Sequence, residues 1–132
     1  MPAKIFIIDD DKELCDEMTQ ILTDEGYSIT SEYDGLKGKE AVEKGGYDLL
    51  LLDLKIPGLS GFDVLKKIRE KNVRIKVIIV SGRPQNNGLI MENAACNNNA
   101  KEEEDILKMA DGIISKPFEV ETILSEIKKI LM

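Results

Sequence analysis

Continuous apolar runs alternate along this chain with stretches in which apolar residues recur every three or four positions. Each run is short and bounded by turn-forming or charged residues, which is typical of a strand. The five predicted strands are Ile5–Ile8, Tyr27–Glu32, Leu49–Leu52, Val77–Val80 and Gly112–Ile114. A run that is apolar at every position, such as Leu49–Leu52, indicates a strand covered on both faces. The pattern therefore predicts an α/β fold with a parallel sheet.

Helical periodicity fills the spaces between these runs. It is strongest at Leu14–Leu22, which precedes a helix-ending Gly26, and at Val120–Leu131. Three further predicted helices are Leu36–Lys44, Phe62–Ile68 and Lys101–Met109. Strands and helices that alternate in this way predict βα units packed around one sheet.

The length and composition fit one folded domain. We expect a single domain over residues 1–132, because chains of this size usually build one core. The apolar fraction of 42% with 33% charged residues is ordinary for a globular protein. The 18 basic and 25 acidic residues give a net charge of −7, which would repel the phosphate backbone of a nucleic acid. Direct binding of DNA or RNA is therefore not expected.

The sequence also bears on location and on thiol and imidazole chemistry. The run Ile5–Ile8 is too short for a signal peptide or a membrane span, so we expect a cytoplasmic protein without membrane insertion. Cys15 and Cys96 offer no second pair for a metal site or disulfide framework and are predicted to be free thiols. The chain has no histidine, so any phosphohistidine must come from a partner.

Polar side chains follow the predicted strands at their carboxyl ends, the edge at which open parallel sheets bind ligands. They are Asp9 and Asp10 after the first strand, Asp53 after the third, Ser81 after the fourth and Lys116 after the fifth. Carboxylates gathered at one point repel one another unless a cation compensates them, and Mg²⁺ prefers such oxygen ligands. The pattern predicts a magnesium site at which Asp53 accepts a phosphoryl group, with Ser81 and Lys116 pairing with its oxygens.

These residues resemble the receiver domain of bacterial two-component response regulators. The resemblance covers nearly the whole chain and rests on the segments Ile5–Asp11, Asp48–Gly61, Ser81–Gly82 and Lys116–Phe118. It implies a flavodoxin-like, doubly wound sheet of five parallel strands in the order 2-1-3-4-5, with helices on both faces.

The resemblance implies a role for each residue at the strand ends. Asp53 would be the phosphoacceptor, Asp10 a direct metal ligand, Asp9 a ligand through water, and Lys55 a ligand through its backbone carbonyl. Ser81 would be a switch hydroxyl that turns onto the phosphoryl group, and Lys116 would pair with Asp53 or its phosphate. The bond between Lys116 and Pro117 could supply the cis peptide of the family.

The implied function is that of a stand-alone response regulator. A histidine kinase or phosphotransfer protein would phosphorylate it, and phosphorylation would bias a two-state equilibrium around strands four and five. The chain would catalyse its own phosphorylation and dephosphorylation, without being a metabolic enzyme. Because the last predicted helix, Val120–Leu131, leaves no room for an output domain, we expect an unknown protein as the downstream target.

Two alternatives stay open at this point. Asp9 could be the nucleophile of a haloacid-dehalogenase-like phosphohydrolase, with Asp11 two residues later. That pattern expects Thr or Val where Glu13 stands, and it leaves Asp53 without a role. Asp10 or Asp11 could also simply cap the first predicted helix, and Asp11 is the better candidate for that role alone. The second alternative is a receiver-like adaptor that is not phosphorylated.

The chain departs from the family pattern at three places. Arg83–Asn99 is a predicted insertion between strand four and the next helix, either a tolerated surface loop or a change in output. Ile113 stands where the family often has an aromatic switch residue. Lys55 and Arg83 are both cationic, and we hypothesise that they change the lifetime of the phosphoryl group.

Overall fold

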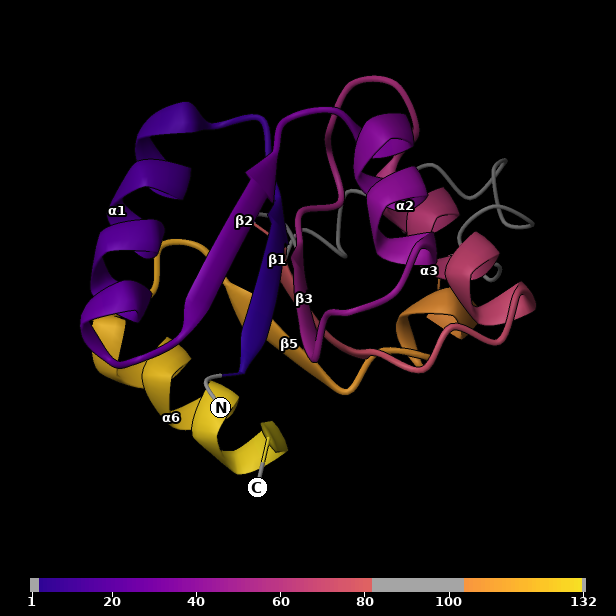
Figure 1. Ribbon diagram of the computed structural model, residues 1–132. Coiled ribbons are helices and arrows are strands. Elements are labelled where there is room, and N and C mark those ends of the chain that lie inside the picture. Colours follow the sequence, from indigo (N-terminus) through magenta and orange to yellow (C-terminus); the bar gives the residue numbers. More distant parts are fainter. Residues whose placement is uncertain (1–2, 82–103, 132) are drawn as a thin grey trace.

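The computed structural model describes residues 3–81 and 104–131 of the chain (Figure 1). Five parallel strands form one sheet in the order β2-β1-β3-β4-β5. The strands are β1 (Lys4–Ile8), β2 (Ser28–Glu32), β3 (Leu49–Leu52), β4 (Lys76–Ser81) and β5 (Gly112–Ser115). Every predicted strand is confirmed to within one residue at each end. The α/β class, the parallel sheet and the order 2-1-3-4-5 are confirmed as well.

Helices connect the strands and flank the sheet. They are α1 (Lys12–Asp24), α2 (Gly35–Glu43), α3 (Gly61–Glu70) and α6 (Val120–Leu131). Of the predicted helix Lys101–Met109, residues 104–107 are helical and residues 101–103 lie outside the described part of the chain. The predicted insertion Arg83–Asn99 also lies outside the described residues. Within the described ranges, no helix has the length and hydrophobicity needed to cross a bilayer.

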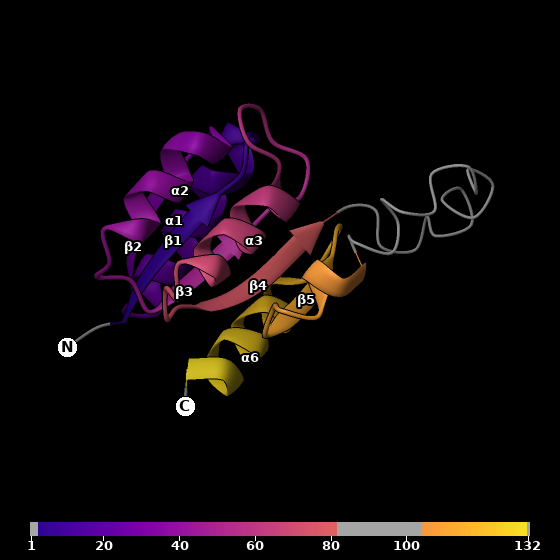
Figure 2. The ribbon, with the colours of Figure 1, turned by 90° about the vertical axis from the view of Figure 1, so that its right-hand side faces the viewer.

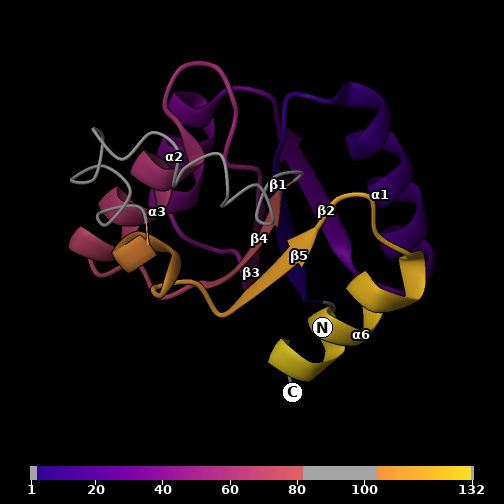
Figure 3. The ribbon, with the colours of Figure 1, turned by 180° about the vertical axis from the view of Figure 1, so that it is seen from behind.

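The sheet divides the apolar core into two layers. Helices α1 and α6 cover one face, and α2 and α3 cover the other (Figures 1 and 3). Side chains alternate between the faces along each strand, so in β1 Ile5 and Ile7 face the first layer while Phe6 and Ile8 face the second. Both layers are buried, which explains why β1 and β3 are apolar at nearly every position.

Short polar residues begin three of the helices by capping their free backbone N–H groups. The side chains of Asp11, Asp34 and Ser60 accept hydrogen bonds from the first turns of α1, α2 and α3. For Asp11 the donor is the N–H of Leu14, at 3.1 Å. The interpretation of Asp11 as a helix cap is therefore confirmed.

Arg69 on α3 ties together segments that are distant in sequence, at the amino end of β4. Its guanidinium donates to the carbonyl oxygens of Met109, at 3.1 Å, and Ile75, at 2.8 Å. It also pairs with the Asp111 carboxylate at 3.2 Å. The same Asp111 oxygen accepts the N–H of Val77 at 2.8 Å. Arg69 thus holds α3, the start of β4 and the segment before β5 in one arrangement.

We expect Arg69→Met to lower the free energy of unfolding by about 2 kcal/mol, because it leaves partly buried carbonyl oxygens without their charged donor. Urea titration followed by circular dichroism measures this difference. The matched control is Arg74→Met at an exposed arginine, which should change stability by less than about 0.5 kcal/mol. Equal effects of the two changes would contradict a structural role for Arg69.

Candidate functional site

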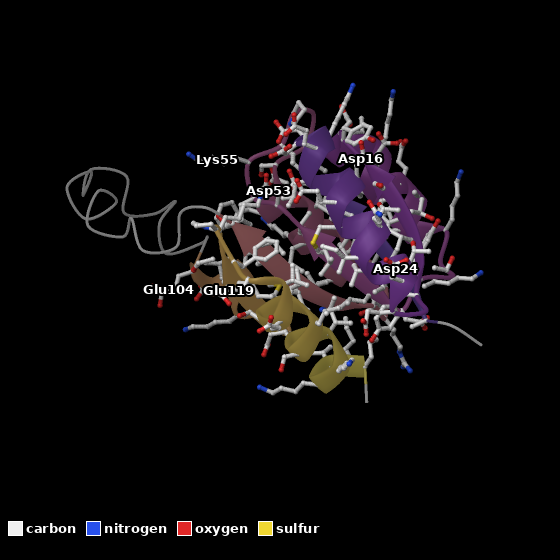
Figure 4. All side chains as sticks on the ribbon, turned by 90° about the vertical axis from the view of Figure 1, so that its left-hand side faces the viewer. Asp16, Asp24, Asp53, Lys55, Glu104 and Glu119 are labelled. Atoms are coloured by element: carbon white, nitrogen blue, oxygen red, sulfur yellow. The ribbon has the colours of Figure 1, made fainter. Side chains whose placement is uncertain are left out.

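Three carboxylates meet at the carboxyl edge of the sheet. One oxygen each from Asp9, Asp10 and Asp53 lies within 4.8 Å of the others. Asp9 and Asp53 are buried, with 3% and 8% of their surface exposed, whereas Asp10 is exposed. Figure 4 shows Asp53 at this edge and the side chain of Lys55 pointing outward beyond it. The three acidic residues singled out from the sequence are therefore brought together.

Backbone hydrogen bonds fix the positions of these residues just beyond the strand ends. The N–H of Asp9 donates to the carbonyl of Glu32 at 3.1 Å, and the N–H of Asp53 donates to that of Ile8 at 2.9 Å. The N–H of Lys116 donates to the Ser81 carbonyl at 2.8 Å. The sheet thus extends its hydrogen-bond ladder into the site, so the placement of the side chains follows from strand register.

Lys116 is the cation of the site. Its Nζ lies 2.7 Å from Asp9 Oδ2 and 3.8 Å from Asp53 Oδ2, so it pairs with both carboxylates and lies closer to Asp9. The resemblance implied only the pair with Asp53. Asp9 is the more deeply buried carboxylate and has more to gain from a charged donor. Burial alone would lower the pKa of Lys116, but the hydrogen bond from Lys116 to Asp9 and the nearby carboxylates raise it overall. The peptide bond before Pro117 is cis, as predicted.

Asp53 is an unfavourable anion in this setting. Burial, followed by the negative charge of Asp9, raises the pKa of Asp53 from 3.8 to about 6, although Lys116 opposes the shift. The N–H of Lys55 gives only a long contact to Asp53 Oδ1, at 3.5 Å. A cation bound among the carboxylates would relieve their repulsion, and a set of carboxylate oxygens fits Mg²⁺ well. The role of the Lys55 carbonyl stays a prediction.

This environment predicts that Asp53→Asn stabilises the protein when a chelator removes divalent metal. The pKa of Asp53 is higher in the folded than in the unfolded chain, so the folded state favours the protonated carboxyl. At neutral pH the ionised carboxylate therefore lowers the free energy of unfolding. At neutral pH we expect Asn to add about 2 kcal/mol to the free energy of unfolding. The gain should shrink as the pH falls from about 6 and vanish below 3.8, where the carboxyl is protonated in both states.

Chemical unfolding of both proteins across this pH range measures the effect. Asp16→Asn, at an exposed carboxylate of α1 labelled in Figure 4, is the matched control and should show no such dependence. A loss of stability in Asp53→Asn at neutral pH would contradict the assigned environment.

Ser81 and Ile113 lie on β4 and β5, the strands that adjoin the Lys116 backbone. Ser81 ends β4, is 2% exposed, and is paired in register with Ser115 of β5. Figure 2 shows β4 and β5 side by side. Ile113 lies on β5 with 48% of its surface exposed, so this apolar side chain faces outward at the position where the resemblance expects an aromatic residue. Gly82 and Arg83 lie outside the described residues.

Two features of the site were not assigned from the sequence. Cys15 on α1 is fully buried, and its thiol contacts the Asp9 carbonyl at 3.4 Å. Burial raises the pKa of Cys15 to about 12, so it is an unreactive free thiol that packs under the site. Its spacing of three and seven residues from Met18 and Leu22, which are also buried, signals an inward position on α1. Cys96 lies outside the described residues.

Gly61 is the second unassigned feature. It begins α3 directly against Asp53, and a Cβ atom at this position would lie 2.2 Å from the Asp53 carbonyl oxygen. Only glycine permits this approach, so the start of α3 packs on the backbone of Asp53. The pair Ser60-Gly61 is recognisable in the sequence as a turn, but the contact partner is not.

The arrangement also bears on the phosphohydrolase alternative. That alternative needs Asp11 beside Asp9 as a second functional carboxylate. In the structure the Asp11 side chain is exposed and caps α1, whereas Asp53 joins Asp9 and Asp10. The geometry therefore favours Asp53 as the centre of the site.

Comparison with known proteins agrees with this arrangement. A family model described as the response regulator receiver domain matches residues 5–128. The transcriptional regulatory protein DltR of Streptococcus agalactiae is 31% identical over 129 residues, which cover 95% of this chain and 50% of DltR. The response regulator ArlR of Staphylococcus aureus is 29% identical over 129 residues, covering 98% of this chain and 52% of ArlR. The chain thus spans about half the length of these relatives.

Solved structures of response regulators also superpose on this chain. A CheY-like response regulator receiver domain protein from Methanospirillum hungatei superposes with a TM-score of 0.81 at 27% identity, covering 99% of this chain and 94% of the other. The response regulator TrrA from Thermotoga maritima, in complex with Mg²⁺ and BeF, has a TM-score of 0.78 at 25% identity. The superposition covers 98% of this chain and 99% of TrrA.

Proposed function

Since the chain belongs to the response regulator receiver domain family of two-component systems, we propose that it accepts a phosphoryl group on Asp53 in a magnesium-dependent reaction. The observation that carries this proposal is the convergence of Asp9, Asp10 and Asp53 within 4.8 Å, with Lys116 within reach of both buried carboxylates. Carboxylates with a single lysine suit phosphoryl transfer, in which catalysis consists mainly of positioning and charge stabilisation.

Asp9, Asp10 and Asp53 would hold Mg²⁺, together with the backbone carbonyl of Lys55. When bound, the ion would polarise the phosphoryl group and offset its negative charge. The TrrA relative was solved with Mg²⁺ and BeF, which supports the same choice of metal for this chain.

In the transfer step, an Asp53 carboxylate oxygen attacks the phosphorus of the donor. A new P–O bond forms to Asp53 and the donor's bond to phosphorus breaks, with its electron pair left on the donor. Because this chain lacks histidine, we propose a phosphohistidine of a histidine kinase or phosphotransfer protein as donor. Lys116 and Ser81 are the residues proposed to pair with the phosphoryl oxygens. Attack of water on the phosphorus later releases inorganic phosphate and restores the carboxylate.

We propose that phosphorylation shifts a two-state equilibrium at the surface of β4 and β5, which a downstream protein reads. Among the described residues, Ser81 at the end of β4 is proposed to respond, since it lies beside the Lys116 backbone. With Ile113 in place of an aromatic residue, this switch works without a phenolic hydroxyl. The identity of the target and a cytoplasmic location stay predictions.

Labelling with a small phosphodonor such as acetyl phosphate tests the proposal. Intact-mass spectrometry should show one added phosphoryl group in the presence of Mg²⁺ and none after chelation. A protein that stays unlabelled with Mg²⁺, at donor concentrations that label another receiver domain, would support the adaptor alternative instead.

Metal binding itself gives a separate prediction. Mg²⁺ at a hundred times its dissociation constant should add about 2.7 kcal/mol to the free energy of unfolding, since it binds the folded site alone. Thermal unfolding with and without Mg²⁺ measures the shift. Asp10→Asn should remove most of it, because the change takes away one of the three clustered carboxylates. The exposed Asp16→Asn variant should retain it. An identical shift in both variants would rule out Asp10 as a ligand.

A further inference from the structure

A groove of about 260 Å³ lies between α2 and α3, which run side by side on the face of the sheet opposite α6 (Figure 2). It is lined by Leu36, Lys39, Leu59, Lys67, Glu70 and Lys71. None of these residues belongs to the carboxylate site. We refer to this feature as the α2/α3 groove.

The apolar part of the groove is accessible. Leu36 on α2 is 48% exposed, although most large apolar side chains of the described residues are buried in the two core layers. Leu59, from the loop before α3, is partly buried against the second core layer and lines the same groove. A partner's apolar side chain in the groove would cover both leucines and gain the free energy of that burial.

The rim of the groove is cationic. Lys39 Nζ and Lys71 Nζ lie 2.9 Å and 3.2 Å from the same oxygen of Glu43, so two ammonium groups share one carboxylate. Burial would raise the pKa of Glu43, but the two lysines lower it overall and keep the group ionised. Lys67 adds an exposed ammonium group and Glu70 one exposed carboxylate. Three lysines against two carboxylates give these groups a net charge of +1, on a chain whose net charge is −7.

We propose that the α2/α3 groove docks an acidic segment of a partner protein that carries at least one large apolar side chain. The apolar side chain would sit on Leu36 and Leu59, and flanking Asp or Glu residues would pair with Lys67 and Lys71. The volume lies below the roughly 300–1,000 Å³ of typical small-molecule pockets, so it suits inserted side chains of a peptide. The negative remainder of the chain repels an acidic partner elsewhere and so restricts it to the groove.

This proposal does not rest on phosphorylation of Asp53, and its test uses the whole chain without a phosphodonor. The probe is a library of random peptides displayed on phage and selected against the immobilised protein. We expect the enriched peptides to combine Asp or Glu with Leu, Ile or Phe. The enriched peptides are then synthesised with a fluorescent label, and fluorescence anisotropy gives their affinities for the protein.

Charge reversal at the rim should weaken these peptides strongly. Lys67→Glu replaces attraction by repulsion and is expected to lower affinity by about tenfold and to reduce its dependence on salt. Leu36→Ser removes the apolar contact at a position that is 48% exposed, and should also weaken binding. The matched control is Lys129→Glu on α6, whose lysine side chain is 78% exposed on the opposite face; it should bind as the wild type does.

Several outcomes would overturn the proposal. One is a selection that enriches no acidic, apolar peptides. Another is binding that Lys67→Glu and Leu36→Ser leave unchanged, or that Lys129→Glu weakens equally. Concentration-dependent dimerisation that Lys67→Glu abolishes, seen by analytical ultracentrifugation, would assign the groove to a second copy of this chain instead.

Discussion

Asp53→Asn is expected to abolish labelling by a small phosphodonor completely in the presence of Mg²⁺. An amide has no anionic oxygen to attack phosphorus, so the change removes the proposed nucleophile and preserves its shape. The same change is expected to stabilise the fold, because it removes a buried charge whose pKa is raised. Lost labelling in a more stable protein therefore cannot be attributed to unfolding. Intact-mass spectrometry over time, with an unfolding curve for each sample, measures both effects.

Asp9→Asn and Asp16→Asn complete the comparison. The exposed Asp16→Asn should be labelled at the wild-type rate. Asp9→Asn should slow labelling, because Asp9 is a member of the proposed metal cluster, but it leaves Asp53 in place. Labelling that persists in Asp53→Asn and disappears in Asp9→Asn would instead make Asp9 the nucleophile, as in the phosphohydrolase alternative.

Lys116→Met should lower the labelling rate by roughly 10²- to 10³-fold, the usual effect of removing one preorganised charge-stabilising group. Lys116 is the one cation that the structure places within 4 Å of Asp53 among the described residues. Methionine keeps much of the length and apolar stem of the side chain but cannot pair with a phosphoryl oxygen. The rate is measured at saturating donor by intact-mass spectrometry.

The loss of Lys116 also leaves Asp9 buried without its closest charged partner, which should lower the free energy of unfolding by about 3 kcal/mol. Rates must therefore be compared under conditions in which circular dichroism shows both proteins folded. Lys76→Met, at an exposed lysine at the other end of β4, is the matched control and should change neither quantity. A folded Lys116→Met protein that labels at the wild-type rate would refute the role of Lys116.

The strands and the edge at which the site lies could be predicted because both depend on local patterns. The four leucines of β3 are apolar at every position, and the structure buries all of them. The residue that follows each strand must lie at the carboxyl edge in any parallel sheet, so Asp9 and Asp53 had to lie at the same edge. They come together because β1 and β3 are neighbours in the sheet. The strand order required the family resemblance, because pairing such as Ile5 with Leu49 is not encoded in either segment alone.

Partners of long side chains could not be predicted from the sequence. The bond from Lys116 to Asp9 joins residues 107 positions apart, and its preference over Asp53 depends on a difference of about an ångström. Arg69 and Met109 are 40 positions apart, and only the packed structure brings them together. The α2/α3 groove was missed for the same reason, since its lysines are individually indistinguishable from solvated surface residues.

The division of the core into two layers has a consequence for assembly. The sheet separates α1 and α6 from α2 and α3, so a peptide seated in the α2/α3 groove lies on the opposite side of the molecule from α1 and α6. The proposed peptide would therefore leave the surface of α1 and α6 open to a second protein. Under this proposal, a peptide-bound protein and a second partner on α1 and α6 would form a ternary complex around one sheet.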